Sequence, residues 1–475
     1  MTIDILPDVA LLEIFDFCLN AYPRYQEDKR SAAWQAVVHV CQTWRNVVFG
    51  SPLRLNLRLY CEPRRTPVRE MMVVWPELPI SVSDDCNKIR DKEKWVDNIV
   101  AVFEHSDRIC RLNLKEIQSW HLEKVLAAMQ QPFPVLTDLE LWSKYGETAQ
   151  VVSESFLGGS APQLQTLTLS SILFPGLPKL LLSATRLVRL YLWNIPHSGY
   201  ISPETMVTCL SVLTRLQTFV VEFESPQSRS DRNSRLPPPQ TRTLLPVLTF
   251  LEFKGVSEYL EDLVARIDAP RLTDFGTIFF HQLIFDTPQL TQFIRRYMPA
   301  FETFDEARLK FSDDNGYISI SLYPPVYSFF RSLTFATTCN QSDWQLSFLT
   351  QMCSLSFPQD LISAMEHLSI EYRCPSLATP WQDDVEDSQW LEFLHPFTGV
   401  KTLYISEEFT PRVAPAMQEL VGERVTEVLP ALQTLFLRDP SLSRVQDTFG
   451  KFLAARQLAN LPIVVSRREI DWFED

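Results

Sequence analysis

APQLQTLTLSS, at residues 161–171, contains the pattern P-x-L-x-x-L-x-L. The alternation of leucine with polar residues predicts a short strand that has one apolar face. The same pattern returns as FPVLTDLELWS at 133–143, LPVLTFLEFKG at 245–255 and LPALQTLFLRD at 429–439. A pattern that returns this often along one chain predicts a repeated unit of structure.

The spacing of these strands supports a repeat. Strands without the proline, such as GVKTLYIS at 399–406, extend the series, and the middle apolar residue of each strand marks its position. Successive markers are 27, 28, 23, 29, 32, 24, 58, 35, 35 and 32 residues apart. The step of 58 is close to two units of 29, which predicts a weakened copy near 301–311. The markers are Leu112, Leu139, Leu167, Leu190, Phe219, Leu251, Phe275, Leu333, Leu368, Leu403 and Leu435.

Steps of this size that begin with L-x-x-L-x-L are typical of leucine-rich repeats. One strand with its return helix cannot bury its apolar face alone, so stacked units share a core behind parallel strands. The predicted fold class is α/β, with an N-terminal helical unit followed by a leucine-rich-repeat solenoid that has a parallel inner sheet. The alternative is a doubly wound sheet. It needs longer strands and a glycine-rich loop, and the chain has 12 glycines against 33 prolines.

Composition restricts the partners of the 475-residue chain. Its net charge of −14 disfavours the basic face that nucleic-acid binding requires. The nine cysteines form no C-x-x-C pair, as expected of reduced thiols in the cytoplasm or nucleus. The opening segment lacks a basic start, and no apolar run approaches the ~18 residues of a membrane span. We expect neither a nucleic-acid nor a membrane partner.

Residues 1–52 do not repeat and are predicted to be helical. Pro7 suits a helix start, and VALLEIFDFCL at 9–19 is apolar on nearly every side. A second helix is predicted over 33–48, and Gly50, Ser51 and Pro52 end it before a first strand in LRLNLRL at 53–59. So much apolar surface on a small unit predicts a partner helix.

His39 and Cys41 lie two residues apart in the second predicted helix. Residues i and i+2 of a helix point to different sides, which disfavours a thiolate–imidazole pair. Cys41 also falls on the apolar stripe, where a cysteine is usually an unreactive small hydrophobe. A zinc site is disfavoured because no second pair of ligands has the required spacing.

LPDVALLEIFDFCL at 6–19, followed by VVHVCQTWRNVVFGSP at 37–52, resembles an F-box. The order of an F-box, leucine-rich repeats and segments such as QWLEFLHPFTGVKTLYIS at 389–406 is similar to a large family of fungal F-box proteins. The resemblance implies that residues 1–52 dock on the Skp adaptor of a cullin–RING ubiquitin ligase. The implied adaptor-binding residues are Leu6, Pro7, Leu11, Leu12, Ile14, Phe15, Val40, Cys41, Trp44 and Arg45.

The resemblance further implies a non-catalytic receptor in which the repeats, residues 53–445, bind the protein to be ubiquitinated, with no cofactor. An enzyme is disfavoured because the motifs G-x-S-x-G, H-E-x-x-H, G-x-G-x-x-G and the P-loop do not occur. The seven histidines are isolated, so no metal site is predicted. A repeat-based interaction scaffold that works outside any ligase is the other open alternative.

Substrate-binding candidates follow from the alternation of side chains. Residues that flank the buried leucines face the inner wall of the array, where most are threonine, serine or glutamine. Aromatic residues and arginines there resemble the residues that dominate binding at interfaces. The alternatives are that a loop of the chain covers them or that Trp142 packs under the rim. The candidates are Trp142, Arg189, Tyr191, Trp193, Tyr404 and Arg438.

The last segment, residues 446–475, is predicted to be a C-terminal cap and tail. A helix from about Val445 to Ala459 and a closing strand would cover the open apolar end of the array. The polar stretches at 225–243 and 381–387 are predicted to be surface loops.

Overall fold

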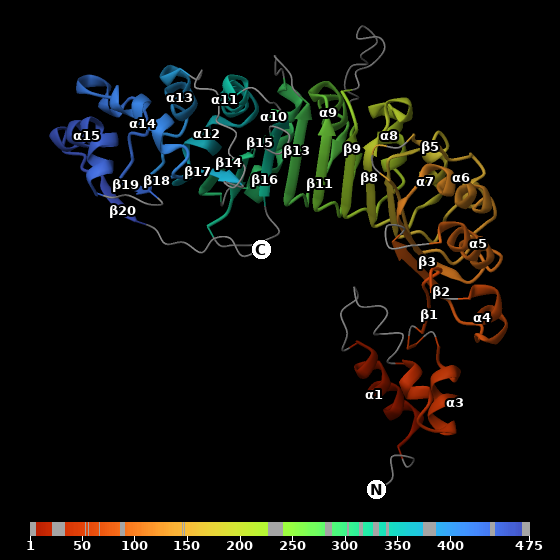
Figure 1. Ribbon diagram of the computed structural model, residues 1–475. Helices are drawn as coiled ribbons and strands as arrows, with labels where there is room; N and C mark the ends of the chain where they lie inside the picture. The colour runs from red at the N-terminus through yellow and green to blue at the C-terminus, as the bar shows by residue number, and fades with distance from the viewer. Residues whose placement is uncertain are drawn as a thin grey trace. The chain divides into compact units, whose positions relative to one another are not determined.

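A computed structural model gives the structure of the chain (Figure 1). It divides into two compact units, Met1–Gly199 and Tyr200–Asp475. The residues that the structure describes are 6–20, 34–52, 54–55, 57–65, 67–85, 91–144, 146, 148–226, 241–280, 287–301, 304–312, 317–325, 332–338, 342–373, 386–437 and 442–467.

The first unit begins with helices and continues with strands that alternate with helices. Its sheet has the order β1-β2-β3-β4-β6-β8, and each neighbouring pair is parallel. The short strands β5 and β7 form a separate parallel pair. The elements are α1 (Asp8–Asn20), α3 (Gln42–Gly50), β1 (Leu59–Cys61), α4 (Val68–Val74), β2 (Ile80–Asp85), α5 (Lys92–Phe103), β3 (Ile109–Ile117), α6 (Ser119–Ala128), β4 (Asp138–Ser143), β5 (Gln150–Val151), β6 (Thr166–Ser170), β7 (Ile172–Leu173), α7 (Leu177–Ser183) and β8 (Arg189–Ile195).

The second unit continues the alternation of strands and helices. Its strand order is β9-β11-β13-β16-β15-β14-β17-β18-β19-β20, and β10 pairs with β12 apart from it. The elements are α8 (Pro203–Leu210), β9 (Thr218–Phe223), β10 (Thr243–Leu244), β11 (Phe250–Gly255), α9 (Ser257–Val264), β12 (Ile267–Asp268), β13 (Asp274–Phe280), α10 (Pro288–Phe301), β14 (Glu306–Ser312), β15 (Tyr317–Tyr323), β16 (Ser332–Thr338), α11 (Ser342–Gln351), α12 (Gln359–Ser363), β17 (His367–Arg373), α13 (Asp387–Leu394), β18 (Thr402–Ile405), α14 (Thr410–Gln418), β19 (Thr434–Leu437), α15 (Leu442–Leu458) and β20 (Val464–Arg467).

The markers of the sequence repeat lie in register with one another. In the first unit, Leu112 pairs with Leu139, Leu139 pairs with Leu167, and Leu167 pairs with Leu190. In the second unit, the same ladder runs from Phe219 to Leu333 and again from Leu368 to the last marker. Every marker is at most 1% exposed. The predicted period is therefore confirmed within each unit.

The repeated proline lies in a turn that leads into each strand. Leu164 donates its backbone N–H to the carbonyl of Ala161. In the same way, Leu248 donates to the carbonyl of Leu245, and Leu432 donates to that of Leu429. The proline is then the second residue of a four-residue turn, where its fixed φ is favourable. Each turn sets the direction in which the next strand enters the sheet.

A strand does lie near the copy predicted within the step of 58 residues, since β14 pairs in parallel with β17 and aligns Ala307 with Leu368, but its place in the sheet differs from the expected one. Phe275 on β13 pairs directly with Leu333 on β16, so no weakened repeat lies between them in the sheet. Strand β14, near the predicted copy, instead pairs with β17 on the far side of β16. Strands β14, β15 and β16 form an antiparallel meander, with Ser312 opposite Tyr317 across the first hairpin. The insertion therefore departs from a purely parallel array.

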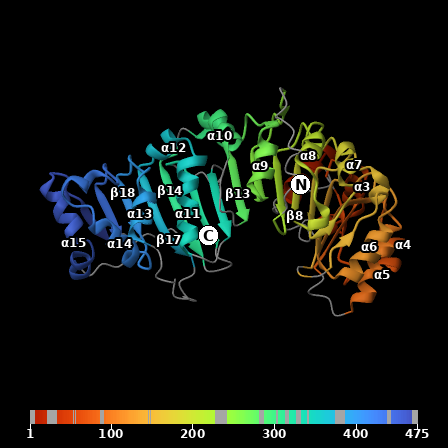
Figure 2. The same cartoon turned by 90° about the horizontal axis from the view of Figure 1, so that it is seen from above.

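Within each unit, the helices lie along one face of the strands (Figure 1). Figure 2 shows strands of the second unit, such as the neighbours β14 and β17, side by side behind these helices. A doubly wound sheet would carry helices on both faces. The fold is therefore mixed α/β with a sheet in which parallel pairing dominates, and we call the face turned away from the helices the inner wall.

The C-terminal elements lie where the sequence predicted a cap. The residue range of helix α15 overlaps the helix predicted from about Val445 to Ala459, and strand β20 pairs in parallel with β19. Arg456 of α15 is fully buried and donates from its guanidinium to the carbonyl of Pro430 at 3.2 Å. Its contact ties the last helix to the turn before β19.

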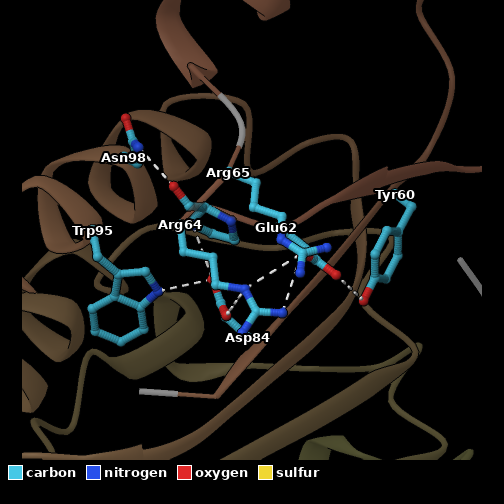
Figure 3. Close-up of polar contacts among 8 residues, drawn as sticks. Tyr60, Glu62, Arg64, Arg65, Asp84, Trp95 and Asn98 are labelled. Carbon is cyan, nitrogen blue, oxygen red and sulfur yellow. Dashed lines mark hydrogen bonds and ion pairs between the residues drawn. The ribbon is translucent and has the colours of Figure 1, made fainter. Parts of the chain in front are cut away.

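The predicted first strand at 53–59 begins later, since β1 starts at Leu59. The segment after β1 is held by a polar network around Asp84, which is fully buried on β2 (Figure 3). Its carboxylate accepts hydrogen bonds from the Arg64 backbone N–H at 3.0 Å and the Trp95 indole N–H at 3.1 Å. Asn98 donates to the carbonyl of Pro63 at 2.7 Å. The network fixes this loop against β2 and α5.

Candidate functional site

Helix α1 is apolar on two opposite sides, and one of them forms the core of the head, residues 6–52. Leu11, Leu12 and Phe15 are at most 7% exposed, and the ring of Phe15 packs 4.9 Å from that of Trp44. These residues, all predicted to bind the adaptor, therefore hold the two helices of the head together. Trp44 itself is half-buried.

The prediction of a single helix over 33–48 is wrong. Residues 34–38 are helical, His39 and Val40 form a turn, and α3 begins only at Gln42. Cys41 is extended, with φ −157° and ψ 172°, and its sulfur accepts a hydrogen bond from the Trp44 backbone N–H at 3.4 Å. The side chain thus satisfies one of the free donors at the start of α3. The thiol acts here as a helix cap.

The other side of α1 is open. Ile14 is 42% exposed, Val9 63% and Phe17 79%, and these positions share the side of the helix opposite Leu11, Leu12 and Phe15. The sequence did not single out Val9 and Phe17 as contacts. When apolar residues occur on every side of a helix, the pattern does not show which side packs against the rest of the protein. The exposed large apolar residues of the head, which we call the head patch, are Leu6, Val9, Ile14, Phe17, Val40 and Phe49.

The remaining predicted adaptor contacts lie near this patch in the sequence. Pro7 is exposed beside Leu6, and Arg45 is exposed while its Nε donates to the carbonyl of Val38 at 3.1 Å. An exposed apolar patch of this kind on a small helical unit is typical of a docking surface.

The inner wall of the first unit follows the predicted alternation. Along β4 the leucines are buried, whereas Asp138, Glu140 and Trp142 are half-buried on the wall. Along β8 Arg189 is exposed and Tyr191 and Trp193 are half-buried in the same way. The registers place Trp142, Ser170 and Trp193 in one row across β4, β6 and β8.

The aromatic candidates are brought together over β6. Strands two apart in a sheet lie about 9.6 Å from one another. The ring centroids of Trp142 and Trp193 are only 6.5 Å apart and nearly parallel, so the two side chains lean toward each other over Ser170. Tyr191 stacks on Trp193 at 6.1 Å. Ser170 is only 4% exposed beneath them, so a small residue on β6 makes room for the cluster.

Charged groups surround this aromatic cluster. Lys115 on β3 lies over the Trp142 ring at 5.7 Å and 3.9 Å from the carboxylate of Glu140. Arg189 donates to the Thr166 hydroxyl at 2.8 Å. Among the described residues, the buried indole Nε1 of Trp142 has no hydrogen-bond partner. The cluster offers aromatic faces, both charges and one unused donor.

The later candidates are less informative. Tyr404 on β18 is half-buried on the inner wall, between Ser369 and Phe436 in the register. Arg438 lies outside the described residues.

Sequence reasoning did not single out two carboxylates on the inner wall of the second unit. Glu222 on β9 is only 7% exposed, and no hydrogen bond or ion pair joins its carboxylate to the described residues. Glu252, half-buried on β11, likewise has none. Burial raises the pKa of Glu222 to about 7, Glu252 adds to the rise and Lys254 opposes it. Burial also raises the pKa of Glu252.

Glu222→Gln should stabilise the protein at alkaline pH. The folded state holds the Glu222 proton more tightly than the unfolded state, so stability falls as pH rises from the usual pKa of 4.5 to about 7. The difference corresponds to about 3 kcal/mol at 1.36 kcal/mol per pKa unit. We expect the variant to gain up to about 3 kcal/mol at pH 8 and nothing at pH 4.5. Urea unfolding of wild type and variant at both pH values measures this, and an equal effect at the two would contradict it.

Other kinds of site find no support in the described part of the chain. There, no group of three or more histidine, cysteine, aspartate or glutamate side chains could hold a metal ion. None of the helices described is both long and apolar enough to cross a membrane.

Comparisons with solved structures find distant structural likenesses. No family model matches the chain, and no curated protein matches it. A solved structure of the leucine-rich repeat-containing protein LegL7 from Legionella pneumophila is similar, at 11% identity and a TM-score of 0.26. The match covers 83% of this chain and 98% of that one. By its own registers, the chain is a mixed α/β protein with a parallel-dominated sheet, consistent with a leucine-rich-repeat-like fold.

Proposed function

We propose that this chain is the substrate-recognition subunit of an SCF-type ubiquitin ligase. The head docks on the Skp adaptor and through it on a cullin–RING ligase, and the inner wall binds the protein to be ubiquitinated. The chain itself carries out no catalysis and needs no cofactor. Its site of action is the cytoplasm or the nucleus, the compartments that scattered reduced cysteines favour.

The head patch is the observation that supports this proposal most directly. It lies on a unit whose sequence resembles an F-box, and α1 contributes Val9, Ile14 and Phe17 to it while a separate apolar side of the same helix holds the head together. Burying one large apolar side chain contributes about 1.5–3 kcal/mol, so a few such contacts suffice for a stable complex. A partner helix of the adaptor fits such a surface.

Isothermal titration of the purified full-length chain with a purified Skp adaptor tests the proposal. We expect a one-to-one complex that also co-elutes in size-exclusion chromatography. If the folded chain shows no heat of binding and no co-elution, it is not a ligase receptor, and the alternative of a repeat-based scaffold outside the ligase stands instead.

The aromatic cluster on the first unit's inner wall is the proposed substrate contact. Tryptophan, tyrosine and arginine dominate the energetics of many interfaces. Trp142→Ala combined with Trp193→Ala should weaken substrate binding by at least about 2 kcal/mol, or roughly 30-fold, and leave adaptor binding unchanged. Substrates are identified by affinity capture under proteasome inhibition, and dissociation constants are then measured with the purified substrate.

Trp120→Ala is the matched control, because Trp120 is 56% exposed on α6, away from the inner wall. It should bind the substrate as tightly as wild type does. A double variant that retains wild-type affinity would move the contact elsewhere, with Tyr404 as the next candidate.

A further inference from the structure

Among the described residues, the two carboxylates on the inner wall of the second unit lack the partners that such groups normally have. Buried carboxylates are usually paired or accept several hydrogen bonds, because removing a charge from water is costly. Glu222 is more than nine-tenths buried and Glu252 half-buried, yet neither has a partner among the described residues. Two under-compensated negative charges therefore lie on neighbouring strands.

The basic side chain opposite Glu222 in the register does not neutralise the two carboxylates. Lys254 stands directly opposite Glu222 in the register of β9 and β11, but no ion pair within 4.0 Å joins them in the described structure. Its charge opposes the rise in the pKa of Glu222 without cancelling it. The pair remains short of positive charge.

The wall is open beside Glu252. Gly276 on β13 is its register partner, and a Cβ built there would meet only the Glu252 side chain within 4 Å. The surface above Gly276 is therefore free for an approaching atom within 4 Å, except for the Glu252 side chain that borders it.

We propose that Glu222 and Glu252 form a recognition site for a basic side chain, lysine or arginine, of a partner protein. An incoming cation supplies the charge-assisted hydrogen bonds that the wall itself does not provide. Complementary charge of this kind selects partners and sets their register on a surface. The proposal rests on the wall alone, so its outcome is independent of adaptor binding by the head.

The test uses the full-length chain and blocked tripeptides as probes. Acetyl-Gly-Arg-Gly-amide and acetyl-Gly-Lys-Gly-amide are titrated at pH 7.5, and acetyl-Gly-citrulline-Gly-amide is the uncharged comparison. We expect at least one basic peptide to bind and the citrulline peptide not to bind. The Glu222→Gln, Glu252→Gln double variant should bind the basic peptide at least tenfold more weakly. Equal binding of the basic and citrulline peptides would overturn the proposal.

A matched double variant separates this site from general attraction to an acidic protein. Glu123→Gln with Glu423→Gln removes the same charge from exposed helical positions and should retain wild-type affinity. If both double variants lose affinity equally, the attraction is non-specific and the proposal fails. The site variant is expected to stay folded, because it removes charges that burial disfavours.

Proton release gives a second readout. Burial raises the pKa of the Glu222 carboxyl to about 7, and binding a cation requires its ionised form. Titrations at pH 7 in buffers of different ionisation enthalpy should therefore reveal proton release on peptide binding. No proton release with wild type, or the same release with Glu222→Gln, would assign the binding to other carboxylates.

Discussion

Ile14→Asp combined with Phe17→Asp is expected to abolish adaptor binding by the full-length chain while its fold persists. Both side chains are exposed on the open side of α1, so the substitutions leave the core of the head untouched. Each loses an apolar anchor of about 1.5–3 kcal/mol and places a charge where the complex would exclude water. The affinity should fall by at least about 100-fold in isothermal titration.

Two controls distinguish docking from unfolding. Val421→Asp with Leu458→Asp makes the same chemical change at apolar residues that are 47% and 87% exposed outside the head, and should bind normally. Leu12→Asp with Phe15→Asp should also lose binding, but through collapse of the head, visible as a loss of helical circular dichroism and as proteolysis of the first 50 or so residues. Wild-type affinity of the Ile14, Phe17 variant would remove α1 from the interface.

The ladder of paired strands could be predicted because the pattern of buried apolar residues repeats along the sequence. Each L-x-L strand has an apolar residue at the same position along the strand, so markers such as Leu139 and Leu167 pair in register. The meander of β14 to β16 could not be predicted in this way, because antiparallel strands carry the same alternation as parallel ones. Only the spatial order tells them apart, since β16 pairs with β13 across a gap of 58 residues.

The head shows a limit of a different kind. The stripe from Val37 to Val48 is compatible with one continuous helix, and the break comes from Cys41 as an extended cap. Cysteine is not among the residues that commonly cap helices, so the sequence carries no signal for it. On α1 the sequence predicts apolar contact on every side but not which side is internal.

The sequence predicts which side chains face the inner wall, but not how deeply each of them is buried. Alternation places Glu222 on the wall as surely as Trp142, yet the stretch TFVVEF at 218–223 is buried at all but its first residue. How deeply a wall residue is covered depends on neighbours from other strands, which the local sequence does not contain. A carboxylate that burial disfavours is therefore found only in the folded structure.

Asp84→Ala is expected to destabilise the first unit by about 2–5 kcal/mol, because it leaves the Trp95 indole N–H and the Arg64 backbone N–H without their acceptor and removes one of the two carboxylates that pair with the Arg64 guanidinium. The carboxylate of Asp84 is fully buried and lies 3.4 Å from the Arg64 guanidinium, which is itself only 21% exposed. Urea unfolding followed by tryptophan fluorescence measures the loss, since Trp95 donates to the same carboxylate.

Two further variants show whether burial is the reason. Asp84→Asn keeps an oxygen that can accept from Trp95 and should cost less than alanine does. Glu93→Ala removes an ion pair with Lys124 at 2.7 Å and a 3.6 Å contact with His121, but Glu93 and Lys124 are more than half exposed, so the loss of stability should be small. If Asp84→Ala is no more damaging than Glu93→Ala, the network around Asp84 does not hold the start of the array. The loop from 62 to 65 would then owe its position to the elements that it joins, β1 and α4, and to the hydrogen bond from Asn98 to the carbonyl of Pro63.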